Sequence, residues 1–168
     1  MSGWVALFRA VNVGGTGKLE MARLRKAASA AGFAEVATYI ASGNLVFASD
    51  LGEVDLRDRL TEAVEAEFGG CPHFLLRTAA DMAAVAARNP FPHGEGSKVL
   101  VVFTDGEPSA EGARHQADEE IAPGEREVFV HFPSRMGNSK LILPASKSGT
   151  GRNMNTLAKL AAMASERR

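Results

Sequence analysis

Cysteine is nearly absent from this chain. Cys71 is the only one among 168 residues, so neither an internal disulfide nor a cysteine cluster for zinc can form. The first residues lack the basic region and apolar stretch of a secretory signal. The longest apolar runs, such as Val99–Phe103, have the length of a strand and fall far short of a membrane span. We therefore expect a protein of the reducing cytoplasm without a membrane partner.

An excess of charge of one sign is also missing, and aromatic residues are few. The formal net charge is −1, and aromatic residues make up 7% of the chain. Nucleic-acid binders usually carry a basic surplus that neutralises phosphates, and RNA binders use aromatic rings on which bases stack. The composition therefore argues against a nucleic-acid partner. The apolar share of 45% is ordinary for a globular protein and argues against disorder.

The first half of the chain contains four strand patterns and two helix patterns. Strands are expected at residues 5–9, 36–41, 45–47 and 74–77, and helices along the apolar stripes that start at Met21 and Leu56. The turn signal at residues 42–44 predicts a hairpin between the second and third strands. The order strand, helix, strand, strand, helix, strand is that of the ferredoxin-like, split βαβ arrangement.

The second half repeats most of this order. Residues 78–81 resemble a capping box that opens a short helix, and residues 89–96 form a linker rich in proline and glycine. The expected elements are a central strand at Val99–Phe103, a helix at 110–120, a hairpin of 128–132 with 141–143, and a last helix from Leu157. No closing strand is evident. We interpret the chain as α+β, a duplication of two ferredoxin-like halves with antiparallel sheets, residues 1–78 and 79–168, packed as one compact unit.

A glycine-rich segment at residues 12–18 lies between the first strand and the first helix. It differs from a P-loop because Asn12 replaces the first glycine and Leu19 replaces the magnesium-binding hydroxyl, and Glu20 occupies the place of the last glycine of a dinucleotide fingerprint. Nucleotide hydrolysis of the P-loop type is therefore not expected. Free backbone amides beside Lys18 and a helix start can still hold an anion. A tight turn that uses the conformational freedom of glycine is the alternative.

Arg9 is a charged residue in an apolar strand, and such side chains are rarely buried without a partner. Pairing of the first and third strands would bring the end of the first beside the start of the third. We call the resulting group the polar edge; it comprises Arg9, Asn12, Gly14, Gly15, Lys18, Ser42, Gly43 and Asn44. These residues form either a ligand site or a structural network that satisfies loop carbonyls, because both have this composition.

A third polar stretch, Arg152, Asn153 and Asn155, precedes the last helix. Asparagine and threonine are common helix caps, but two asparagines beside an arginine exceed the needs of a cap, so these residues join the candidate ligand-binding set. The four histidines have no metal-ligand spacing, and neither a metal nor a cofactor is expected. No catalytic triad or Cys–His pair can be assigned, which leaves the catalytic residues unknown and enzymatic activity open.

Several of these segments resemble an uncharacterised bacterial family, a domain of unknown function. Its members open with Leu-Arg-Gly-Ile-Asn-Val-Gly-Gly and carry Tyr-Ile-Gln-Ser-Gly-Asn and Arg-Asn-Trp-Asn-Thr segments. The corresponding stretches here are residues 8–15, 39–44 and 152–156, with Ala10 in place of a glycine and Met154 in place of the tryptophan. The resemblance implies a duplicated ferredoxin-like α+β fold and no particular reaction. Loss of the tryptophan removes a surface on which an aromatic ligand could stack.

Three functions follow from these observations. The polar edge could bind a small anionic, phosphate-bearing ligand. The ferredoxin-like sheets could instead serve as a protein–protein interaction or structural module without catalytic activity. Contact with RNA is suggested by analogy with the fold alone, which is a weak warrant.

Overall fold

A computed structural model describes residues 1–9, 19–40 and 43–167 of the chain. Contacts divide the chain into two units. Unit 1 runs from Met1 to Ala83 and includes the C-terminal residues from Leu160, and unit 2 runs from Ala84 to Lys159. The division into domains after residue 78 stays a prediction. Within the described ranges, no helix has both the length and the apolar character needed to cross a bilayer.

Unit 1 contains a four-stranded antiparallel sheet. Its strands are β1 (Ser2–Phe8), β2 (Ala34–Thr38), β3 (Asn44–Ser49) and β4 (Phe74–Thr78). They lie in the order β2-β3-β1-β4, so β1 runs between β3 and β4. This is the pairing of first and third strands that the split βαβ order predicts, and the expected hairpin of β2 with β3 is confirmed.

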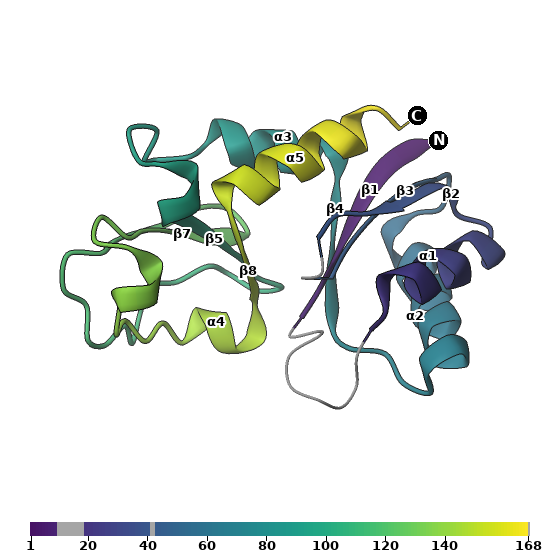
Figure 1. Ribbon diagram of the computed structural model, residues 1–168, viewed down its shortest axis with the longest axis horizontal. Helices are drawn as coiled ribbons and strands as arrows, with labels where there is room; N and C mark the ends of the chain where they lie inside the picture. Colours follow the sequence, from purple (N-terminus) through teal and green to yellow (C-terminus); the bar gives the residue numbers. More distant parts are fainter. Residues whose placement is uncertain (10–18, 41–42, 168) are drawn as a thin grey trace. The chain divides into compact units, whose positions relative to one another are not determined.

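Two helices, α1 (Met21–Ala30) and α2 (Glu53–Phe68), cover one face of this sheet, as Figure 1 shows. Their apolar stripes meet inward-facing strand residues in a single core. Phe47 of β3 is fully buried there, and its ring lies 4.8 Å from that of Phe33. Helix α2 ends at Phe68 and is capped by Gly69, whose φ of 81° is the left-handed conformation that glycine adopts without strain.

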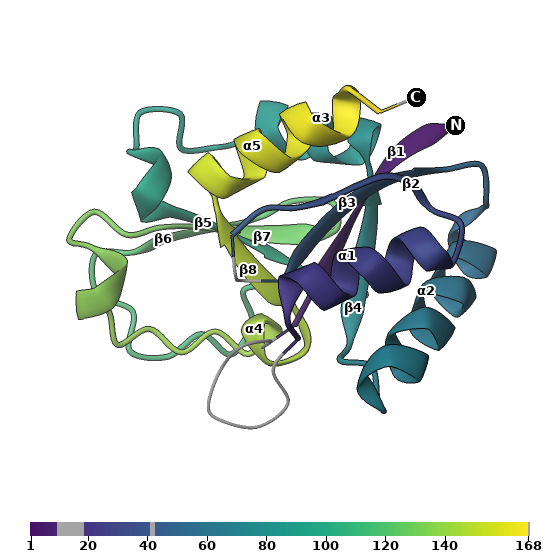
Figure 2. The same cartoon turned by 45° about the vertical axis from the view of Figure 1, so that its right-hand side comes forward.

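Unit 2 contains a second four-stranded antiparallel sheet with the same topology. Its strands are β5 (Val99–Phe103), β6 (Glu120–Pro123), β7 (Glu127–His131) and β8 (Thr150–Asn153), which are labelled in Figure 2. They lie in the order β6-β7-β5-β8. The fold is therefore α+β with two ferredoxin-like halves, as predicted. The other elements are α3 (Ala79–Ala87), the short 3-10 turns η1 (Gly96–Lys98) and η2 (Met136–Asn138), α4 (Ala145–Ser148) and α5 (Met154–Ser165).

Three predictions for the second half were wrong. Residues 110–119 form turns, bends and one isolated bridge, and Glu120 already begins β6. Gly112 and His115 have φ values of 80° and 59°, which interrupt a helix. The partners of β7 are β5 and β6, and the stretch around Ile142 makes only an isolated bridge to Arg114. A closing strand does exist, β8, which was missed because Thr150–Asn153 lacks apolar alternation.

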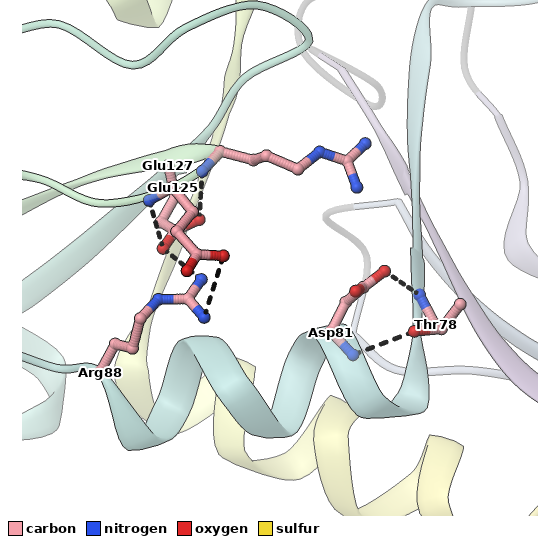
Figure 3. Close-up of polar contacts among 6 residues, drawn as sticks. Thr78, Asp81, Arg88, Glu125 and Glu127 are labelled. Atoms are coloured by element: carbon pink, nitrogen blue, oxygen red, sulfur yellow. Dashed lines mark hydrogen bonds and ion pairs between the residues drawn. The ribbon is translucent and has the colours of Figure 1, made fainter.

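The capping box at the start of α3 is confirmed (Figure 3). The backbone N–H of Thr78 donates to Asp81 Oδ2, and the backbone N–H of Asp81 donates to Thr78 Oγ1, each at 3.0 Å. Both side chains thus satisfy amides that a helix start leaves without partners.

Side chains of β7 alternate between the two faces of the unit 2 sheet. Val128 and Val130, with Phe132 just beyond the strand, pack in a core with Leu143. Glu127, Phe129 and His131 are the intervening residues and therefore lie on the opposite face. This alternation separates the pocket described next, which contains Phe132, from the surroundings of His131.

Candidate functional site

The described part of the polar edge lies at the end of β1. The backbone N–H of Phe8 donates to Gly43 O at 2.9 Å and extends the β1–β3 contact, and that of Arg9 donates to His73 O at 2.8 Å and extends the β1–β4 contact. Asn44 is fully buried, and its Nδ2 donates to Tyr39 O at 3.0 Å. The amide of Asn44 thus supports the β2–β3 hairpin. Asn12, Gly14, Gly15, Lys18 and Ser42 lie outside the described residues.

The stretch before α5 is part of unit 2. Arg152 is buried, its Nη1 donates to Thr150 Oγ1 at 2.7 Å and to Gly151 O at 2.9 Å, and burial lowers its pKa to about 10. Asn153 Oδ1 accepts the backbone N–H of Thr156 at 2.9 Å and caps the helix. The exposed Asn155 covers Gly96, where an added Cβ would collide with its amide. Each residue has a structural contact with another part of unit 2, and a ligand-binding role stays a prediction.

A cavity of about 510 Å³ lies in unit 2. We call it the unit 2 pocket. One wall is the segment that leads into β6, and the other is the segment after β7. The lining residues are His115, Gln116, Ala117, Asp118, Glu119, Phe132, Ser134, Arg135, Asn138, Ser139 and Lys140. A volume of this size is typical of small-molecule sites.

Hydrogen bonds between the two walls hold the pocket together. Ser139 Oγ donates to Glu119 Oε1 at 2.6 Å, and Ser134 Oγ donates to Asp118 Oδ2. Arg114, just before the first wall, and Ile142, just after the second, exchange two backbone hydrogen bonds of 2.9 and 2.8 Å. The pocket is therefore fixed by interactions within unit 2 itself.

Both carboxylates of the pocket accept hydrogen bonds in these contacts. Glu119 is buried, and its second oxygen accepts the backbone N–H of Ala117 at 2.6 Å. The hydrogen bond from Ser139, and after it the one from Ala117, lowers the pKa of Glu119 below its ordinary value. The ionised form of Glu119 is therefore favoured, and each of its two oxygens accepts one hydrogen bond from the pocket walls.

The basic side chains of the pocket are placed differently. Within the described residues, the side chains of His115, Arg135 and Lys140 form no hydrogen bond or ion pair. Arg135 has a φ of 88° and a ψ of 135°, a conformation that residues other than glycine rarely adopt. His115 is also left-handed, with a φ of 59°. Backbone strain of this kind costs about 1–3 kcal/mol and is concentrated at functional sites.

Comparison with known proteins places the chain in a family. The model for the protein of unknown function DUF1697 matches residues 1–129. The chain belongs to this family. A conserved bacterial protein from Streptococcus pneumoniae, of known structure, is 25% identical, with a TM-score of 0.81 over 96% of this chain and 98% of that one. No curated protein is detectably similar. The DUF1697 match ends before the second wall of the unit 2 pocket.

Sequence reasoning missed the pocket of this DUF1697 chain. The sequence predicts a helix at 110–120 for the first wall and a hairpin connection for the second. Neither prediction brings Glu119 and Ser139 together. The only local signal was the polar run from Ser134 to Lys140 between apolar segments. Such a run is also typical of an ordinary exposed loop.

A smaller cavity of about 200 Å³ in unit 1 contains Cys71, together with Arg57, Glu65 and His73. Burial, and after it the nearby Glu65 carboxylate, raises the pKa of the Cys71 thiol to about 11. The thiolate is the nucleophilic form, so the structure argues against a reactive cysteine in this DUF1697 member.

We predict that iodoacetamide alkylates Cys71 at pH 8 roughly a hundredfold more slowly than an unperturbed thiol, because far less thiolate is present. The rate should continue to rise up to about pH 11. Mass spectrometry of the alkylated chain over time measures it, with glutathione as the reference thiol. A rate that levels off near pH 8 would contradict the raised pKa.

Proposed function

We propose that this DUF1697 member binds a small anionic ligand of the phosphate-bearing class in the unit 2 pocket. The observation that carries the proposal is the unequal use of its charged groups. Asp118 and Glu119 accept hydrogen bonds from serines of the opposite wall. His115, Arg135 and Lys140 line the same space without such partners among the described residues.

This arrangement favours an anion over a cation. The formal side-chain charges cancel, but each carboxylate already accepts a hydrogen bond from a serine of the opposite wall, whereas the donors of Arg135 and Lys140 are available. Arginine and lysine donors form charge-assisted hydrogen bonds with phosphate oxygens, and an arginine can bind two oxygens at once. The amide nitrogens of Gln116 and Asn138 donate to Glu119 O at 2.6 Å and to Ser134 O at 3.4 Å, so their amide oxygens are the groups that can accept hydrogen bonds from the uncharged part of a ligand.

Thermal denaturation of the full chain with inorganic phosphate, pyrophosphate and nucleoside monophosphates tests the proposal. A ligand that binds only the folded state adds about 2.7 kcal/mol at a concentration one hundred times its Kd. We expect at least one compound to raise the Tm in a saturable way. Arg135→Gly should abolish this shift without lowering the Tm of the free protein, because glycine tolerates the φ of 88° at this position.

Arg59→Ala is a control of equal charge change on the exposed side of α2 in unit 1, and it should retain the full shift. A ligand shift that survives Arg135→Gly combined with Lys140→Ala would refute the pocket as the site. If the same shift were lost in Lys18→Ala, the ligand would bind at the polar edge, as the sequence predicts. Absence of any shift with all the anions would favour the interaction module.

A further inference from the structure

Two histidines and one glutamate converge in unit 2, outside the pocket. His93 follows Pro92 in the linker, Glu120 begins β6, and His131 ends β7. One potential ligand atom from each, an imidazole nitrogen or a carboxylate oxygen, lies within 4.8 Å of the other two. Glu120 and His131 are directly opposite each other in the β6–β7 ladder, which fixes their approach.

From this convergence we propose that His93, Glu120 and His131 form a binding site for a divalent transition-metal ion. Two imidazoles and one carboxylate are a ligand set that zinc and iron(II) use, with the remaining coordination positions open to water or substrate. In a tetrahedral site with metal–ligand distances of about 2.0–2.1 Å, the ligand atoms are about 3.3 Å apart. The 3.0 Å between His131 Nδ1 and Glu120 Oε1 is already close to that value.

The buried member of the trio is held in place by its neighbours. The Phe91 ring stacks on that of His131, with centroids 5.6 Å apart and an interplanar angle of 28°. Gly94 covers the other edge of the imidazole, where an added Cβ would lie 2.8 Å from His131 Nε2. His131 therefore presents Nδ1, the nitrogen beside Glu120, toward the site. A ligand whose ring orientation is fixed by packing is pre-organised for a metal.

The two other members can adjust. His93 and Glu120 are exposed, and the His93 ring meets that of His131 edge-on at 87°, with centroids 5.5 Å apart. Small rotations of these two side chains would bring their ligand atoms closer to each other and to His131, without movement of the sheet. An ordinary ion pair would explain Glu120 and His131, but it does not require the third group, His93, from the linker.

This site is distinct from the unit 2 pocket, because Glu119 and Phe132 of the pocket alternate along the chain with Glu120 and His131. The proposal also differs from the prediction made from the sequence, which expects no metal because the histidines lack ligand spacing. The three residues come from the linker and two strands, and only strand pairing brings them together. The sequence therefore carries no spacing signal of the kind seen in zinc motifs.

Titration calorimetry of the full chain with Zn²⁺ at neutral pH tests the proposal, and absorption of bound Co²⁺ reports the ligand set. We expect one Zn²⁺ per chain in the unmodified protein. His93→Ala and Glu120→Gln should each weaken the affinity at least tenfold and change the Co²⁺ spectrum. Both residues are exposed, so neither substitution should unfold the protein, which thermal denaturation without metal verifies.

The matched control is His73→Ala, which removes a histidine of unit 1, and it should leave affinity and spectrum unchanged. Failure to bind Zn²⁺, or binding that His93→Ala and Glu120→Gln both leave unaltered, would overturn the proposal. Loss of Zn²⁺ binding in these variants, with the anion-dependent shift in Tm retained, would separate this site from the proposed ligand pocket.

Discussion

Replacement of Arg88 by methionine should lower the free energy of unfolding by about 3–5 kcal/mol. Arg88 Nη2 lies 2.7 Å from Glu127 Oε1, and the side chain of Glu127 is fully buried at the start of β7 (Figure 3). The other Glu127 oxygen accepts the backbone N–H of Arg126 at 2.9 Å. Without Arg88 the carboxylate would stay buried with no countercharge, whereas methionine keeps most of the side-chain volume.

Urea denaturation followed by circular dichroism measures this loss, and Glu125→Gln is its control. Glu125 Oε2 lies 3.6 Å from Arg88 Nη1, but its side chain is 75% exposed, so solvent screens the attraction. Its removal should cost less than about 1 kcal/mol. Equal effects of the two substitutions would show that burial does not distinguish these ion pairs.

Phe47→Ala should also lower the free energy of unfolding, by about 3–5 kcal/mol. Phe47 has no exposed surface, its ring packs against Phe33, and it is surrounded by the apolar stripes of α1 and α2. Alanine would leave a cavity between the sheet and the two helices that cover it, and the surrounding side chains would fill it only in part. The same denaturation experiment measures the effect.

Val54→Ala is the control, because Val54 lies at the start of α2 with 73% of its surface exposed. Its effect should stay within about 0.5 kcal/mol. A loss below about 1 kcal/mol for Phe47→Ala would mean that the core of unit 1 is loosely packed around β3.

The elements of unit 1 were predictable because their residues follow local rules. Leu56, Leu60 and Val64 recur at helical spacing, and all three are buried in the observed core. The capping box of Thr78 and Asp81 depends on residues three positions apart, so the sequence contains the whole motif. The observed strands differ from the predicted ones by a few residues at their ends. Hydrogen-bond pairing with the neighbouring strand, and not residue composition, determines where a strand begins and ends.

The candidate sites were less predictable, for a different reason. Arg152 and Asn153 were chosen from their residue types, and their contacts with Thr150 and Thr156 lie within the same stretch of chain. The serine–carboxylate contacts of the unit 2 pocket join residues 16 and 20 positions apart. An incorrect helix at 110–120 was enough to hide them.

The sequence by itself determined the α+β class and the ferredoxin-like order of unit 1, because periodic burial of apolar side chains is a local signal that each element carries alone. Only the tertiary structure decided that β6 is the neighbour of β7, that Thr150–Asn153 closes the second sheet, and that Glu120 meets His93 and His131. Those contacts depend on which strands pair and in what register, and strand pairing joins backbone groups that every residue except proline shares. Residue types alone therefore do not specify it.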